Sequence, residues 1–110
     1  MDYSQLSDGE LSVRLAYFLK PKYSAVIHPY ELSGAQLSWN WLNTVQYTGY
    51  FPLRNADDLF WVVKKHRITL EPAGKTMWKA SHESVGSAKH RNPLRAAAIV
   101  FLKMQDANNA

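Results

Sequence analysis

Three side chains near the end of the sequence belong to residue types that bind metals. His82, Glu83 and His90 lie within a short segment of the chain. Their spacing matches no pattern that reliably marks a metal site, and ligands on a loop lack the outer hydrogen bonds that hold such sites rigid. The sequence has no Cys, which excludes thiolate ligands and disulfides. We therefore predict no bound metal.

Other reactive arrangements are equally weak. Ser, His and Asp all occur, but no Gly-x-Ser-x-Gly elbow presents a nucleophile. The glycines are scattered along the chain and do not have the spacing of a phosphate-binding loop. The sequence therefore predicts no catalytic residue and no cofactor, and we expect a protein that is not an enzyme.

Basic residues gather in the second half of the chain. Residues 64–110 carry nine bases and three acids, a net charge of +6, whereas residues 1–63 have a net charge of −2. This asymmetry favours a partner with negative charge, although solvated Lys and Arg side chains give the same count. The candidates for contact with an anion or a partner are Lys89, His90, Arg91 and Arg95.

Arg95 stands out among these candidates. It interrupts an otherwise apolar run in the first turn of a predicted helix, where the helix dipole disfavours a cation. A carboxylate or phosphate of a partner would explain it. The alternative is an internal ion pair with one of four acids: Asp2, Asp8, Asp57 or Asp58.

Aromatic residues concentrate in the middle of the chain. Trp39, Trp41 and Tyr50 are the candidates for an aromatic contact patch. If exposed, they would anchor a protein partner or stack on bases, and if buried, they would fill the core. Alternation places Trp39 and Trp41 on the same face of a strand, so the open question is which face meets solvent.

Helix signals occur at three places. A capping box of Ser7 and Glu10 starts the first helix, which ends before Pro21. Asn55 is the predicted cap of a second helix. The third begins at Asn92-Pro93 and is apolar on nearly every side, so we expect it to be the most buried.

Strand signals are weaker and lie between the helices. Short strands are expected within residues 23–28, 37–41 and 44–47, and a hairpin over residues 67–81. The segment 81–91 has no periodicity and predicts a mobile or functional loop. Residues 106–110 are expected to form a frayed tail.

These elements predict one α+β domain over residues 1–110. A small, mainly antiparallel sheet packs against three helices, and 110 residues suit a single core. No apolar run is long enough to cross a membrane, and the polar start does not resemble a signal peptide. We expect a protein without membrane contact, and the sequence leaves its oligomeric state open.

Three segments resemble a known family: DYSQLSDGEL, RNADDLFWVVKKHRITL and NPLRAAAIVFLKMQ. They are similar to the NinX-like family of small proteins of lambdoid phages and prophages of enteric bacteria. Ala56 and Phe60 depart from the family pattern, which has Pro and Trp there. The resemblance implies a phage accessory gene, an α/β/α sandwich and action in the cytoplasm of the bacterial host. It carries over no catalytic residue and no ligand.

The expected function is therefore that of a phage accessory protein, a non-enzymatic module that binds a host or phage protein. The alternative is a nucleic-acid-binding protein that uses the basic second half of the chain. Nucleic-acid binding that weakens steeply with salt would favour the alternative.

Overall fold

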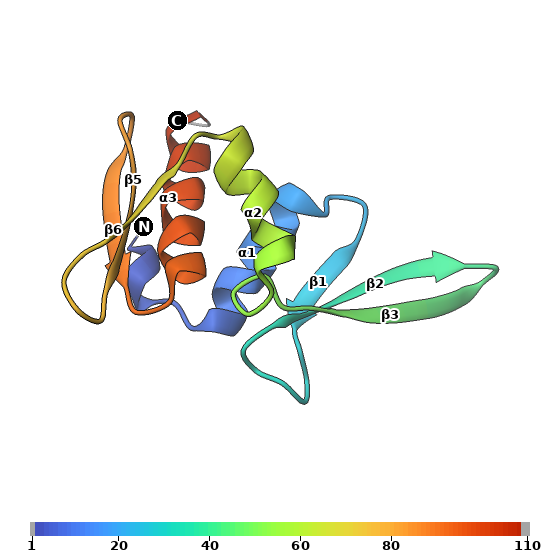
Figure 1. The fold of residues 1–110 in the computed structure, drawn as a ribbon. Coiled ribbons are helices and arrows are strands. Elements are labelled where there is room, and N and C mark those ends of the chain that lie inside the picture. Colours follow the sequence, from blue (N-terminus) through green and yellow to red (C-terminus); the bar gives the residue numbers. More distant parts are fainter. Residues whose placement is uncertain (1, 109–110) are drawn as a thin grey trace. The chain divides into compact units, whose positions relative to one another are not determined.

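The fold combines helices with antiparallel strands (Figure 1). The structure, a computed structural model, describes residues 2–108, which contain three α-helices and six strands. The predicted α+β class is confirmed. The strands form two three-stranded sheets where one was expected. Within each sheet every strand pairs with its neighbour in the sequence, and α2 (Ala56–Lys65) separates the two sheets along the chain, so each sheet forms from consecutive strands.

The chain divides into two compact units, Met1–Pro52 and Leu53–Ala110. The first unit holds one helix and one sheet. Its elements are the 3-10 turn η1 (Tyr3–Gln5), α1 (Asp8–Leu19), β1 (Ser24–Ile27), β2 (Ala35–Trp41) and β3 (Thr44–Tyr50).

The predicted capping box opens α1. The Ser7 hydroxyl accepts a hydrogen bond from the backbone N–H of Glu10 at 3.1 Å, and the Glu10 carboxylate accepts one from the N–H of Ser7 at 3.0 Å. The helix packs on β1 and β2, and this contact buries Leu11, Leu15 and Leu37. These residues form the core of the first unit.

The sheet of the first unit is a meander in the order β1-β2-β3. Strand β1 pairs only with residues 35–38 of β2. Beyond that point β2 and β3 continue as a two-stranded ribbon to their turn, and Figure 1 shows this hairpin reaching past β1. We call residues 39–46 the hairpin extension.

The second unit places a long helix across the second sheet. Its elements are α2 (Ala56–Lys65), β4 (Thr69–Pro72), β5 (Trp78–His82), β6 (Gly86–His90) and α3 (Pro93–Asn108). Helix α3 packs on β5, β6 and α2. Its residues Ala96–Leu102 are all buried, which agrees with its predicted central position.

The ends of α2 and α3 are built differently. Asn92 caps α3 as predicted, since its side-chain oxygen accepts from the N–H of Leu94 at 2.9 Å. Asn55 stands at the N-cap position of α2, but its side chain makes no capping hydrogen bond, contrary to expectation. Its backbone carbonyl accepts from the N–H of Asp58 instead.

The segment 81–91 is a β-hairpin, so the prediction of a loop there was wrong. Strand β5 ends at His82, a tight turn follows, and β6 runs from Gly86 to His90. The signal was hidden because the inward-facing residue opposite Ala80 is only an Ala, Ala88. Small and polar residues give alternation too little contrast to detect.

The end of the chain also differs from expectation. Helix α3 continues to Asn108, so residues 106–108 of the expected frayed tail are helical. The remaining part of that tail, residues 109–110, lies outside the described residues.

Candidate interaction surface

The structure separates the four predicted contact residues of the basic half. Lys89 and Arg91 are exposed. The ring of His90 is half-buried, and its Nδ1 accepts a hydrogen bond from the backbone N–H of Asn92 at 2.9 Å. Arg95 is only 7% exposed, so it offers little surface to a partner. The four side chains therefore do not form one contact surface.

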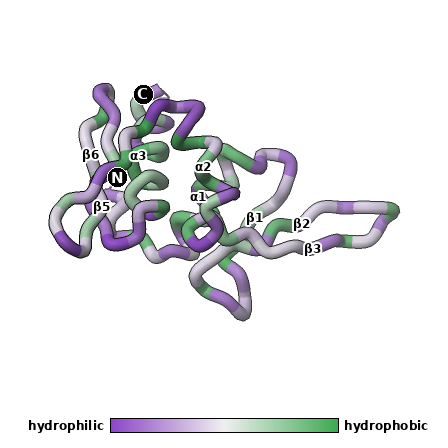
Figure 2. Tube along the Cα trace, in the orientation of Figure 1, coloured by the Kyte–Doolittle hydropathy of each residue, from purple (hydrophilic) through white to green (hydrophobic). Residues whose placement is uncertain are grey.

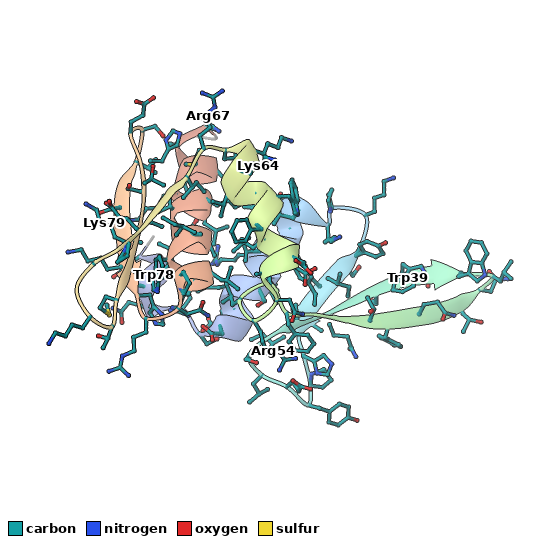
Figure 3. The ribbon with its side chains drawn as sticks, viewed as in Figure 1. Trp39, Arg54, Lys64, Arg67, Trp78 and Lys79 are labelled. Carbon is teal, nitrogen blue, oxygen red and sulfur yellow. The ribbon has the colours of Figure 1, made fainter. Side chains whose placement is uncertain are left out.

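A different basic pair lies on the second sheet. Lys89 of β6 is the register partner of Lys79 of β5, and Figure 3 shows Lys79 on the side of the sheet away from α3. The Lys79 ammonium lies 3.9 Å from the carboxylate of Glu71 on β4, which offsets part of this charge. The exposed face of the second sheet is thus mildly basic.

A polar pocket lies at one end of the same sheet. Its volume is about 340 Å³, and it is lined by Arg67, Thr69, Ser81, His82 and Glu83. A guanidinium and a carboxylate both line it, so its net charge favours neither an anion nor a cation. Among residues 2–108, no group of three or more His, Asp or Glu side chains is placed to hold a metal ion.

The three predicted aromatic contacts have three different environments. Tyr50 is buried in the core of the first unit. Trp39 is half-buried on β2 (Figure 3). Its ring meets the Tyr23 ring edge-on, with 5.4 Å between the ring centroids. Trp41, at the end of the same strand face, is 64% exposed. Exposure therefore increases along this face toward the end of the hairpin.

The hairpin extension presents apolar side chains without any charge. Trp41, Leu42 and Val45 are all exposed there, and Figure 2 shows a hydrophobic segment at the turn that joins β2 to β3. From Leu32 to Leu53 the sequence contains no Asp, Glu, Lys or Arg. Trp41 and Val45 lie on opposite faces of the ribbon, and Leu42 lies at the turn next to Trp41. Exposed large apolar side chains that are neighbours, such as Trp41 and Leu42, are typical of an interaction site rather than of a solvated surface.

The turn of the hairpin has an unfavourable residue. Leu42 and Asn43 connect the strands, and both have left-handed backbone angles, with φ of 49° and 63°. A two-residue turn of this kind favours Asn, Asp or Gly at both positions. Asn43 fits this preference. Leu42 does not, because a left-handed backbone is strained for Leu, and its side chain is 82% exposed. Burial of the Leu42 side chain within the first unit therefore does not offset this strain.

Sequence reasoning missed the exposed positions of Leu42, beside Trp41, and of Val45, on the other face of the ribbon. The available signal was the long uncharged stretch together with a Leu-Asn pair between two alternating segments. Asn at the second turn position is typical of a hairpin turn. Leu at the first position is not, so its presence there needs another explanation.

The chain was also compared with known proteins. A family model described as "Bacteriophage P22, NinX" matches residues 2–105. The chain belongs to this NinX family. The match confirms the resemblance of the three helical segments and also spans the hairpin extension, which lies outside those segments. Comparison with curated proteins and with solved structures gave no match.

The family is one of phage proteins, so this member is a phage protein by descent. Within the described part of the chain, no helix has the length and apolar character needed to span a bilayer.

Proposed function

We propose that this NinX-family member is a non-enzymatic phage accessory protein that binds a host or phage protein in the bacterial cytoplasm. The contact surface is the part of the hairpin extension formed by Trp39, Trp41 and Leu42, with Trp41 and Leu42 as its central side chains. One observation carries the proposal: Leu42 occupies a strained left-handed turn position and is 82% exposed. Backbone strain that gains no packing within the molecule is typical of functional sites.

Side-chain chemistry supports a protein partner. Trp is among the residues that contribute most to protein interfaces, because it buries a large area and loses little conformational entropy. Trp41 stands beside Leu42 and on the same strand face as Trp39. The three together resemble the small apolar centre of an interface, with Asn40 and Thr44 available to form a polar rim.

The absence of charge argues against nucleic acid at this surface. Single-stranded nucleic acid stacks on exposed aromatic rings, but its affinity also needs cations along the phosphate backbone. No cation lies between Leu32 and Leu53 in the sequence. A neutral apolar surface is therefore better suited to an apolar patch of a protein than to the charged backbone of a nucleic acid.

Nucleic-acid binding through the second sheet is the alternative function. The register pairing of Lys79 with Lys89, beside exposed Arg91, supports it. Few cations gather there, and Glu71 offsets one of them. We expect such binding to be weak at about 0.15 M salt, because affinity falls by about 0.9 log units per log unit of salt for each neutralised phosphate.

Site-specific photo-crosslinking in phage-infected cells tests the proposal. A photoreactive amino acid replaces Trp41 in one variant and Phe60 in a matched control, since Phe60 is also a large, exposed apolar residue, on α2. We expect a discrete protein adduct from position 41 and none from position 60. Equal adducts at both positions, or no protein adduct at position 41, would contradict the proposal.

Binding measurements then separate the two functions. With the crosslinked protein purified, Trp41→Ser should weaken binding by roughly 30-fold or more, as expected for a residue worth about 2 kcal/mol at an interface. Lys89→Gln should leave that affinity unchanged. Conversely, a sub-micromolar complex with duplex DNA that Lys89→Gln weakens and Trp41→Ser does not would support the alternative.

A further inference from the structure

Strand β3 has a long unprotected edge. The strand is seven residues long, and within the described part of the chain its outer side pairs with no other strand. Its register with β2 runs without a bulge from Thr44 to Tyr50. Natural proteins usually protect such an edge with a charge, a Pro, a bulge or a covering element. Strand β3 has no charge, Pro or bulge.

The turn fixes which backbone groups point outward. In a two-residue hairpin the residues that flank the turn, here Trp41 and Thr44, form a hydrogen-bonded pair. Every second residue after Thr44 therefore bonds to β2. The N–H and C=O groups of the residues between them, Val45, Tyr47 and Gly49, point to the open edge.

The side chains of these three residues lie together on one face of the sheet. Tyr47 is 61% exposed, and Val45 is exposed beside it. At Gly49 the ring of Phe51 occupies the place of a side chain, since a Cβ there would lie 2.6 Å from that ring. The edge thus presents an aliphatic residue, an aromatic residue and a ring over a glycine, in that order.

We propose that two copies of this chain pair antiparallel through their β3 edges. The two-fold axis lies at Tyr47, so that Tyr47 faces Tyr47 of the second copy and Val45 faces its Gly49. This register satisfies the outward backbone groups of all three residues in each copy. It also places each Val45 against the Phe51 ring that covers the opposite glycine, which is a favourable cross-strand contact.

The charge distribution favours a second copy as the occupant. The whole chain has a net charge of +4, so two copies repel each other through most of their surfaces. The stretch from Leu32 to Leu53 is neutral, which makes the β3 edge a place where two copies can approach without like charges meeting. The order of the edge residues also suits a two-fold pairing, which needs a self-complementary surface.

This inference does not rest on the proposed function. Tyr47 pairs with Ser38, and Trp41 pairs with Thr44, so alternation places the Tyr47 and Trp41 side chains on opposite faces of the ribbon. In an antiparallel pair the two hairpin turns point in opposite directions. The dimer would therefore present two separate Trp41 surfaces and could bind two partner molecules at once.

Sedimentation equilibrium and amide hydrogen exchange of the whole chain test the pairing. We expect a species of twice the 12.6 kDa chain mass. In that species the amides of Val45, Tyr47 and Gly49 should exchange slowly. The amides of Gln46 and Thr48 should exchange slowly in both species, because they point to β2. On dilution to monomer, the first three should become fast while the other two stay slow.

Matched variants complete the test. Tyr47→Lys sets two like charges opposite each other at the axis and should raise the dissociation constant by at least about tenfold. Val26→Lys places the same charge at an exposed position of β1, the other edge of the sheet, and should leave the dimer intact. Trp41→Ser should also leave it intact. Slow exchange of the Gln46 amide in a variant shows that its hairpin is folded. If the hairpin of Tyr47→Lys is not folded, Val45→Lys is measured in its place.

Two results would overturn the pairing. One is a wild-type chain that remains monomeric at millimolar concentration. The other is a dimer that uses another surface. In such a dimer the amides of Val45, Tyr47 and Gly49 exchange as fast as in the monomer, or the dissociation constant is the same with Tyr47→Lys and Val45→Lys as with the wild type.

Discussion

The side-chain amide of Asn92 donates a hydrogen bond to the backbone carbonyl of Leu53, with 2.7 Å between nitrogen and oxygen. The oxygen of the same amide accepts from the N–H of Leu94, and the backbone N–H of Asn92 donates to the ring of His90. One residue thus joins the start of α3, the end of β6 and the segment before α2. This explains why Asn, rather than Ser or Thr, suits this cap.

Asn92→Ala should therefore cost more than an ordinary cap. The lost cap contributes about 0.5–2 kcal/mol and the lost bond to Leu53 about 0.5–1.5 kcal/mol, so we expect the free energy of unfolding to fall by roughly 1–3 kcal/mol. Asn92→Ser keeps an acceptor for the N–H of Leu94 and loses only the donor to Leu53, so it should cost less. Urea melts measure both. Equal losses for the two variants would show that the cap oxygen contributes nothing.

Two phenylalanines provide a matched test of the core. Phe101 on α3 is 2% exposed, whereas Phe60 on α2 is 58% exposed. Phe101→Ala should lower the free energy of unfolding by about 3–5 kcal/mol, since it empties a large buried site. Phe60→Ala removes the same atoms from a site in water and should cost below about 1 kcal/mol. Similar losses in denaturant melts would mean that α3 is not the centre of the second unit.

The end of α2 has a residue that its backbone does not favour. Arg67 has a φ of 55°, and the N–H of Ile68 bonds back to the carbonyl of Val63 at 3.0 Å. This is a Schellman motif, whose left-handed position is usually Gly. Arg67→Gly should raise the free energy of unfolding by up to about 1 kcal/mol. Lys65→Gly, two residues earlier and inside the helix, should lower it by about 1 kcal/mol. A loss with Arg67→Gly would show that the Arg side chain itself stabilises the unit.

His66 should make stability depend on pH. Burial, followed by the charge of Lys65 and then His82, lowers the pKa of His66 below its ordinary value of 6.5. The unfolded chain then binds a proton at a pH where the folded chain does not, so stability is complete above pH 6.5 and decreases as pH falls below it.

Two measurements check this. In an NMR titration, the His66 ring should protonate at a lower pH than a free His. Its ring contacts Phe101, with 5.2 Å between centroids, so the Phe101 resonances should move with it. His66→Gln should flatten the pH profile of the unfolding free energy below neutrality. A profile that this substitution leaves unchanged would assign the effect to the other histidines.

Sequence reasoning predicted those parts of the fold whose signals are local and strong. The capping box of Ser7 and Glu10 and the Asn92-Pro93 start of α3 are hydrogen-bonding patterns within a few residues, and both are present. Strand β6 was missed because Ala88 is too small to mark a buried face. Asn55 was assigned a capping bond that its side chain does not make, since residue type sets only a preference.

The candidate surface was partly predictable for a physical reason. Alternation placed Trp39 and Trp41 on one face, but alternation cannot show where the covering element ends. Helix α1 packs on β1 and β2, and β1 pairs only with residues 35–38 of β2, so the hairpin extension lies beyond the three-stranded part of the sheet. Tyr50, in the three-stranded part, is buried, whereas Trp41, in the extension, is exposed. The lengths of neighbouring elements decide this, and a single strand sequence does not contain them. Arg95 is the converse case, since it is buried in α3 although Arg side chains usually stay in solvent.

The strained turn yields a prediction that joins stability to function. Leu42→Asn gives the first left-handed position of the turn a residue that tolerates it, so the free energy of unfolding should rise by a few tenths to about 1 kcal/mol. The same change removes an exposed apolar side chain from the proposed contact surface, so the protein adduct from a photoreactive residue at position 41 should decrease. Asn43→Gly is the matched control: it also relaxes the turn but leaves Leu42 in place, and it should keep the adduct. A stabilised Leu42→Asn variant with an undiminished adduct would remove Leu42 from the contact surface. A destabilised variant would show that Leu42 packs within the hairpin, and the strain argument for its function would then fail.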